Sequence, residues 1–160
     1  MTTFLIGFMG SGKTTIAQLL TEDFIDMDQV IVARIGMPIS TFFAEAGEAT
    51  FREIESEILE ILSKTGGIIS TGGGVVMSEE NRRILRESKS EVIYLKSDFD
   101  ALYQRITVDS TNIRPLFINN SRAELQAIFE SRAPLYESVA TRIITVSDKT
   151  PEEIIKEIRR

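Results

Sequence analysis

Residues 7–14 constrain this chain more than any other segment, because they read Gly-x-x-x-x-Gly-Lys-Thr. An apolar run, Thr3–Phe8, leads into them as a predicted buried strand, and Lys13–Thr21 follows as a predicted helix. In this context glycines let backbone N–H groups turn inward around phosphate oxygens, and the helix N-terminus adds positive potential. Lys13 would reach the β and γ oxygens, and the Thr14 hydroxyl would ligate Mg²⁺. The pattern predicts nucleotide binding; the alternative is a turn that only joins strand to helix.

Strands and helices alternate along the rest of the chain. Periodicity and turn residues predict further strands at Phe24–Asp28, Gly67–Ser70, Val92–Leu95 and Arg142–Val146, and helices at Ala46–Lys64, Ser78–Glu87, Asp98–Ile106, Ala123–Leu135 and Pro151–Arg160. Such alternation predicts a mainly parallel sheet with helices on both faces. The polar segment 108–121 is long for a structureless connection, so we expect a functional lid there. We expect one α/β domain over residues 1–160.

Composition and charge exclude several classes of function. The net charge is −6 and no stretch is densely basic, which argues against nucleic-acid binding. The chain has no histidine and no cysteine, so a general base must be a carboxylate, a lysine or water. No apolar stretch approaches the roughly 20 residues that span a bilayer, and residues 1–8 lack the features of a signal peptide. We expect a cytoplasmic enzyme without a membrane partner.

Two carboxylates, Asp26 and Asp28, end the predicted strand at 24–28. Residues two apart on a strand point to the same side, and the carboxyl end of a parallel strand is where open α/β sheets bind ligands. One carboxylate would hold Mg²⁺ through its water, and the other would accept a proton from an attacking hydroxyl. The alternative makes Asp28 the N-cap of a following helix and Asp26 a solvated strand end.

Arg132 and the glycines at 72–74 each allow two interpretations. Arg132 falls on the apolar stripe of its predicted helix, so its guanidinium either extends to water or meets an anion in a cleft. The three glycines close a predicted strand, where absent side chains let a ligand reach the backbone, although a plain turn fits as well.

Arg52 and Arg114 are equally open from their local context. Arg52 lies between Glu48 and Glu55 at helical spacing, which favours an ordinary surface salt bridge. Arg114 lies in the polar segment, where an arginine is either solvated or closes on a transferred phosphate.

Taken in order, six motifs give the chain a resemblance to the shikimate kinases along nearly its whole length. They are GFMGSGKTT, FIDMD, FREIE, TGGG, IRPLF and RAPLY. The resemblance implies a P-loop fold of the nucleoside-monophosphate-kinase type, with a five-stranded parallel sheet in the order 2-3-1-4-5. It implies phosphoryl transfer from ATP to the 3-hydroxyl of shikimate, with Mg²⁺, in a monomer.

The resemblance also implies roles at the nucleotide end of the site. The residues that would hold the ATP phosphates are Gly10, Ser11, Gly12, Lys13, Thr14 and Thr15. Thr14 would bind Mg²⁺, assisted by Asp26 through water. Arg114 would be the lid arginine on ATP, and Lys149 would lie beside the adenine.

At the acceptor end, the resemblance makes Asp28 the contact for the shikimate hydroxyls and the candidate base. Arg52 and Arg132 would clamp the carboxylate, and the backbone of Gly73 would contact the acceptor. Such a site works by alignment and charge neutralisation, with the lid excluding water.

The chain departs from the family pattern in two places. The stretch from Lys13 to Asp26 is shorter by about one helical turn, which predicts either a trimmed first helix or a tighter loop after it. The segment ThrValAspSerThrAsn lacks the Arg-Thr pair that many members carry before Arg-Pro-Leu, and Arg105 lies two residues earlier. The adenine contacts are therefore left open.

Three rival functions remain to be compared. Another small-molecule kinase, for gluconate or a nucleotide, shares the fold, although two arginines around a carboxylate suit an acid. A GTPase switch should carry N-K-x-D and D-x-x-G, which do not occur. A non-catalytic relative should have lost Lys13, Asp28 or an arginine, and these are retained.

Overall fold

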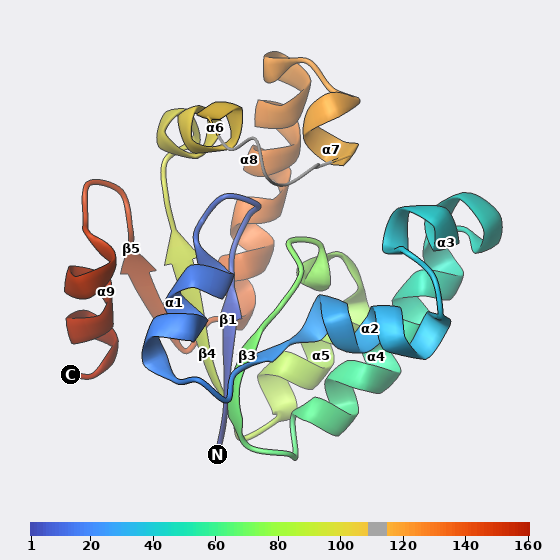
Figure 1. Cartoon of the computed structure of the whole chain (residues 1–160), viewed down its shortest axis with the longest axis horizontal. Coiled ribbons are helices and arrows are strands. Elements are labelled where there is room, and N and C mark those ends of the chain that lie inside the picture. Colours follow the sequence, from blue (N-terminus) through green and yellow to red (C-terminus); the bar gives the residue numbers. More distant parts are fainter. Residues whose placement is uncertain (109–114) are drawn as a thin grey trace.

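The computed structural model describes residues 1–108 and 115–160 and forms a layered α/β fold (Figure 1). The strands are β1 (Thr2–Ile6), β2 (Ile25–Asp26), β3 (Gly67–Ser70), β4 (Glu91–Lys96) and β5 (Arg142–Thr145). The helices are α1 (Lys13–Leu20), α2 (Met27–Ile35), α3 (Ile39–Ala46), α4 (Glu48–Leu62), the short 3₁₀ helix η1 (Val75–Met77), α5 (Glu79–Glu87), α6 (Phe99–Val108), α7 (Pro115–Ile118), α8 (Arg122–Val139) and α9 (Pro151–Ile158).

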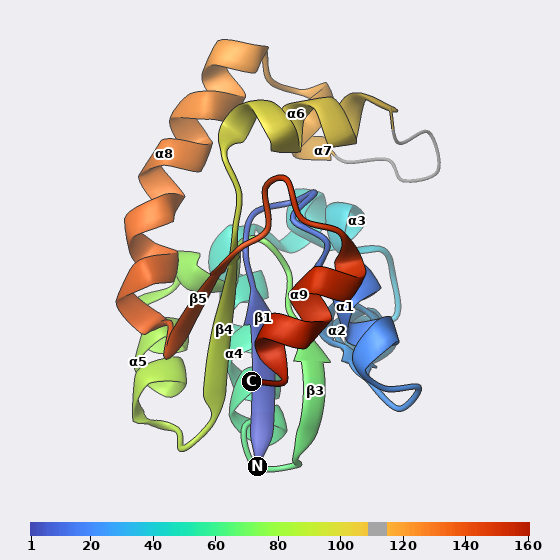
Figure 2. The same ribbon diagram turned by 90° about the vertical axis from the view of Figure 1, so that its left-hand side faces the viewer.

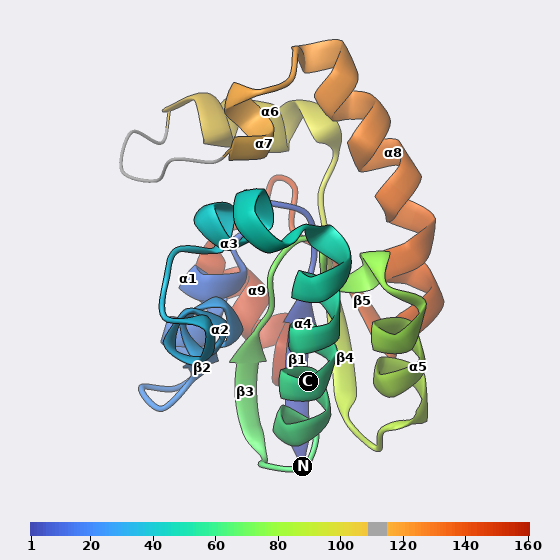
Figure 3. The same ribbon diagram turned by 90° about the vertical axis from the view of Figure 1, so that its right-hand side faces the viewer.

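The five strands form one sheet in the order β2-β3-β1-β4-β5, and every neighbouring pair is parallel. The sequence prediction of strand order and direction is confirmed. Figure 2 shows α1 and α9 on one face of the sheet, and Figure 3 shows α4 and α5 on the other. The carboxyl ends of β1, β2 and β3 therefore open on the same edge, where ligands bind in sheets of this kind.

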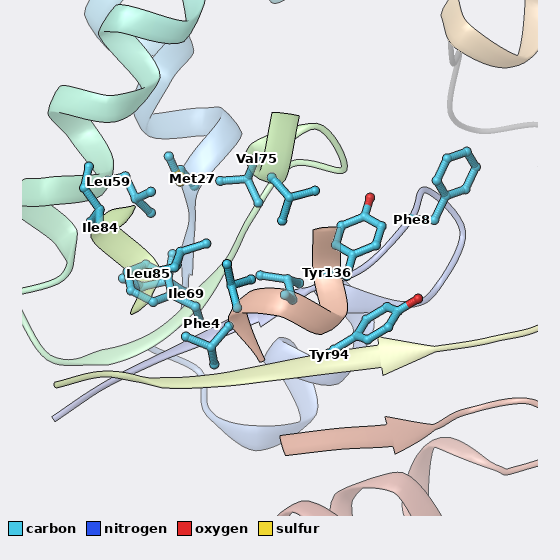
Figure 4. Close-up of a cluster of buried hydrophobic side chains, with 14 of the residues drawn as sticks. Phe4, Phe8, Met27, Leu59, Ile69, Val75, Ile84, Leu85, Tyr94 and Tyr136 are labelled. Carbon is cyan, nitrogen blue, oxygen red and sulfur yellow. The ribbon is translucent and has the colours of Figure 1, made fainter. Parts of the chain in front are cut away.

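The central strands are apolar at consecutive positions because both faces are covered. Phe4 and Ile6 of β1 pack with α4, α5 and α8 in the larger cluster, whereas Leu5 packs with α1 and α9 in the smaller one. Figure 4 shows the larger cluster, in which Tyr94 of β4 stacks on Tyr136 of α8 with ring centroids 5.1 Å apart. This packing fixes α8 against the sheet along its C-terminal half.

The segment after β2 differs from the sequence prediction. The strand predicted at 24–28 contains only Ile25 and Asp26, and α2 begins at Met27. The Asp26 side chain caps this helix by accepting from the backbone N–H of Asp28 at 3.0 Å. An N-cap of this kind satisfies a helix N–H that has no partner within the helix, which ends the strand early. The prediction that both aspartates project from one strand is therefore wrong.

Other elements differ in part from the sequence prediction. No helix is predicted at 39–46, and a helix after residue 28 enters only through the alternative role of Asp28, whereas the N-cap is Asp26. The helix α8 continues to Val139 instead of ending at Leu135. Ser78 caps α5 by accepting from the N–H of Asn81. The first helix is short, ending at Leu20, in agreement with its trimmed sequence.

The segment predicted as a lid, 108–121, contains the short helix α7, and residues 109–114 lie outside the described part of the chain. Its function as a lid stays a prediction. Within residues 1–108 and 115–160, no helix has the length and apolar character needed to cross a membrane.

Candidate active site

The glycine-rich loop between β1 and α1 has the backbone of a phosphate cradle. Gly10 and Gly12 have φ of 81° and 93°, in the left-handed region that favours glycine. A Cβ at Gly10 would also lie 2.9 Å from Cγ1 of Ile106 on α6. The loop can therefore turn its N–H groups inward and still pack against α6, as the motif predicts.

Lys13 lies over this loop. Its ammonium donates to the carbonyl oxygens of Gly7 at 2.7 Å and Phe8 at 3.1 Å, and only 9% of the residue is exposed. One helix position on, the Thr14 hydroxyl lies 3.2 Å from the hydroxyl of Ser70, the last residue of β3. The predicted phosphate-binding lysine and metal-binding hydroxyl therefore lie where β1 and β3 end.

Asp28 enters the same region from the first turn of α2. Burial raises the pKa of its carboxyl, and the neighbouring charge of Asp26 raises that pKa further. The positive charges of Lys13 and Arg52 act in the opposite direction on this pKa. Asp28 is thus a desolvated carboxylate between a like charge and two cations, the arrangement that suits a general base.

The three glycines after β3 face the predicted acceptor-binding side chains. A Cβ at Gly72 would lie 2.9 Å from Oδ1 of Asp28, and one at Gly74 would lie 2.6 Å from Nη2 of Arg52. A Cβ at Gly73 would lie 3.4 Å from the backbone N of Met9 in the loop and 3.9 Å from Nη1 of Arg132. The glycines therefore let Asp28, Arg52 and Arg132 approach the backbone beside the phosphate cradle.

Arg52 makes both of the ion pairs that its spacing predicts, but one is not an ordinary surface pair. Nη2 lies 3.4 Å from Glu48, whose side chain is exposed, whereas Nη1 donates to Oε1 of the buried Glu55 at 2.9 Å. Asn81 donates to the same Oε1 at 2.8 Å and to the carbonyl of Val75 at 3.0 Å. Burial raises the pKa of Glu55, and Arg52 opposes that rise. Glu55, which is itself held by Asn81, therefore fixes the position of the Arg52 guanidinium.

Arg132 projects from α8 toward the loop rather than into bulk solvent. Its guanidinium carbon lies 5.8 Å from the ring centre of Phe8, a residue of the phosphate loop. Of the two interpretations of its place on the apolar stripe, the structure favours the cleft.

Two further residues, Arg114 and Lys149, are predicted to contact the nucleotide. Arg114 lies outside the described residues. Lys149 forms an ion pair with Glu157 of α9 at 2.6 Å, so its predicted place beside the adenine stays a prediction.

Sequence reasoning missed the buried groups that support this site. The sequence pattern makes Glu55 only the partner of a surface arginine, and it gives Asn81 no role. Tyr136, whose hydroxyl donates to the carbonyl of Gly73, was quoted in a motif without a role. Arg105 donates to the carbonyl of Gly10 at 2.6 Å. The available signal for Tyr136 was its spacing of four residues from Arg132, which places both on one helix face.

Comparison with known proteins identifies the family. The family model described as "Shikimate kinase" matches residues 9–160. The chain is 51% identical to the shikimate kinase of Streptococcus gordonii and 49% identical to that of Streptococcus thermophilus, with 99% of each chain covered in both cases. Its structure resembles that of the shikimate kinase from Acinetobacter baumannii in complex with shikimate. The TM-score is 0.87 and the identity 30%, over 99% of this chain and 90% of the other. The chain therefore belongs to the shikimate kinase family.

Proposed function

We propose that this chain transfers the γ-phosphoryl group of ATP to the 3-hydroxyl of shikimate, giving shikimate 3-phosphate and ADP. The observation that carries the proposal is the packing of Asp28, Arg52 and Arg132 against the successive glycines 72–74, beside the phosphate loop. Two arginines and one aspartate that pack against glycines suit a small acceptor that has a carboxylate and several hydroxyls.

The acceptor half of the site would act by orientation. Arg52 and Arg132 would bind the shikimate carboxylate and fix the distance of the 3-hydroxyl from the phosphate loop. Asp28 would accept a hydrogen bond from that hydroxyl and take its proton as the bond to phosphorus forms. The raised pKa of Asp28 makes this carboxylate a better proton acceptor than an exposed aspartate.

The nucleotide half would act by charge neutralisation. The loop N–H groups and Lys13 would bind the phosphates, and the left-handed glycines 10 and 12 allow the required backbone. Arg114 would add a second protein cation from the lid, and closure of that lid would exclude the water whose attack wastes ATP.

The donor set fits Mg²⁺. The candidate ligands are oxygens, the Thr14 hydroxyl and the Asp26 carboxylate acting through water, and Mg²⁺ is usually held by few protein oxygens with phosphates and waters completing its shell. Among the described residues, no group of three or more His, Cys, Asp or Glu side chains is placed to hold a metal ion. When bound, the ion would neutralise phosphate charge as the β–γ bond breaks. We expect the enzyme to be a cytoplasmic monomer.

A comparison of acceptors tests the proposal. Release of ADP is measured by a coupled assay with shikimate, gluconate and nucleoside monophosphates, each with ATP and Mg²⁺. We expect turnover with shikimate and little with the others. A higher kcat/KM for gluconate or for a nucleotide would assign the site to another kinase of the same fold.

A further inference from the structure

The hydroxyl of Tyr136 lies beside the proposed acceptor site. Tyr136 is fully buried on α8, one helical turn after Arg132. Its hydroxyl donates a hydrogen bond to the carbonyl oxygen of Gly73, the central glycine of the triple-glycine segment. Figure 4 shows the Tyr136 ring within the core cluster, beside the ring of Tyr94.

Arg132 packs against the same glycine, because its Nη1 lies 3.9 Å from the position of a Cβ at Gly73. The positive charge of Arg132 also opposes the rise that burial causes in the pKa of the Tyr136 hydroxyl. A phenolic hydroxyl has one proton to donate and lone pairs to accept. Donation to Gly73 uses that proton and leaves the lone pairs, which suit a cationic neighbour.

Fixing the Gly73 carbonyl has an effect one residue further on. The peptide between Gly73 and Gly74 is planar, so a fixed carbonyl oxygen also fixes the direction of the Gly74 N–H. Gly74 is the residue that packs against the guanidinium of Arg52. One buried hydroxyl thus acts on the backbone that lies beside both acceptor arginines.

We propose that Tyr136 is a positioning residue for acceptor binding, which holds the Arg132 guanidinium and the glycine backbone in one fixed relation through its hydroxyl. The inference rests on the proposed function, because it specifies how the shikimate end of that site is organised. Tyr136 does not touch the reacting atoms. It acts on KM for the acceptor through Arg132 and Gly73.

Tyr94 supplies a matched control. Its ring stacks on that of Tyr136 at an interplanar angle of 25°, and only 2% of the residue is exposed. Among the hydrogen bonds found within residues 1–108 and 115–160, none involves the Tyr94 hydroxyl. Tyr94→Phe and Tyr136→Phe therefore each remove one hydroxyl from the same aromatic pair, and only the second loses a hydrogen bond to the acceptor site.

The test measures KM for shikimate, KM for ATP and Tm for the parent, Tyr136→Phe and Tyr94→Phe. Loss of a buried hydrogen-bond partner should raise KM for shikimate about tenfold in Tyr136→Phe, with KM for ATP within about twofold. Tyr94→Phe should keep both KM values near the parent. A purely structural role would lower Tm in Tyr136→Phe while leaving KM for shikimate unchanged or raising both KM values together. Either pattern overturns the inference.

A second measurement keeps Tyr136 and so does not require that Tyr136→Phe folds. The chain has three tyrosines, at 94, 103 and 136. In a Tyr94→Phe/Tyr103→Phe protein, biosynthetic 3-fluorotyrosine labels position 136 alone. Addition of shikimate should shift its fluorine resonance, and the shift should be lost in an Arg132→Ala background that still binds ATP. An unchanged resonance at saturating shikimate contradicts the inference.

The kinetics of the parent enzyme distinguish failure of the proposed function from failure of the role of Tyr136. If the parent shows no shikimate-dependent ADP release, the proposed function fails and the inference fails with it. If the parent turns over shikimate and Tyr136→Phe has the kinetics of Tyr94→Phe, only the role of Tyr136 is overturned.

Discussion

The guanidinium of Arg52 occupies the space that a side chain at Gly74 would need, since a Cβ there would lie 2.6 Å from Nη2 and 3.1 Å from Nη1. Gly74 has φ of −95° and ψ of 9°, which other residues also adopt. The glycine is therefore required by the neighbouring arginine and not by its own backbone conformation.

Gly74→Ala should consequently weaken shikimate binding without lowering the stability of the fold. The methyl group displaces the flexible end of Arg52, so we expect KM for shikimate to rise about tenfold with little change in Tm. Gly36→Ala is the contrasting control, because its φ of 74° is strained for alanine but nothing lies within 4 Å of the added Cβ. That variant should lose about 1–2 kcal/mol of stability and keep its KM. A normal KM in Gly74→Ala would contradict the assignment of Arg52.

Lys13→Ala should abolish turnover in a folded protein. Lys13 donates to the carbonyls of Gly7 and Phe8 and would bind phosphate oxygens, so a loss of kcat of at least about a hundredfold is expected. Lys64→Ala, an exposed lysine paired with Glu60, should leave kcat unchanged. Circular dichroism and Tm establish that both variants are folded. Comparable rates for Lys13→Ala and the parent would exclude the proposed ATP site.

The two aspartates should separate in a magnesium titration. Asp28→Asn should lower kcat with nearly unchanged Mg²⁺ dependence, whereas Asp26→Asn should raise the Mg²⁺ concentration for half-maximal rate. Asparagine caps a helix as well as aspartate does, so Asp26→Asn keeps the start of α2. The measurement is the rate against Mg²⁺ at saturating ATP and shikimate. A metal shift in Asp28→Asn alone would reverse the two roles, and undiminished turnover in both would make the pair structural.

Asp28 should also make stability depend on pH. Its pKa is raised above the ordinary 3.8, so the folded state binds the proton more tightly than the unfolded state. The resulting contribution to stability is present below the ordinary pKa and is lost as pH rises through the raised folded value. Asp28→Asn should therefore have a higher Tm than the parent near pH 8, and the difference should shrink as pH falls toward 4. A difference that does not vary with pH would contradict this account.

Particular residues show which parts of the structure can be predicted from the sequence. The loop at 7–14 was predictable, because its chemistry depends on local backbone and fixed spacing. The end of β2 was not, because Phe24 to Asp28 alternates like a strand while the Asp26 side chain caps a helix. That cap was visible only once the start of α2 was known.

The acceptor site illustrates a different limit. Spacing alone left Arg52 as a surface residue, since nothing near it in sequence shows that Glu55 is buried against Asn81 of another helix. The resemblance to the family proposes roles for these residues, and the structure supplies a reason for the triple glycine. The contacts of residues 28, 52 and 132 with the glycines at 72–74 join elements far apart in the chain, and no local pattern encodes them.

Titration of shikimate into the parent and Arg132→Ala tests the central claim, that Arg132 and the glycine segment form the acceptor site. A desolvated charge-assisted contact contributes roughly 1.5–3 kcal/mol, so shikimate affinity should fall by about tenfold or more, whereas ATP affinity should change much less. Arg83→Ala is the control, because Arg83 is exposed and pairs only with Glu80 and Glu87 among the described residues. Equal weakening of both ligands in Arg132→Ala, or a lower Tm with unchanged shikimate affinity, would contradict the claim.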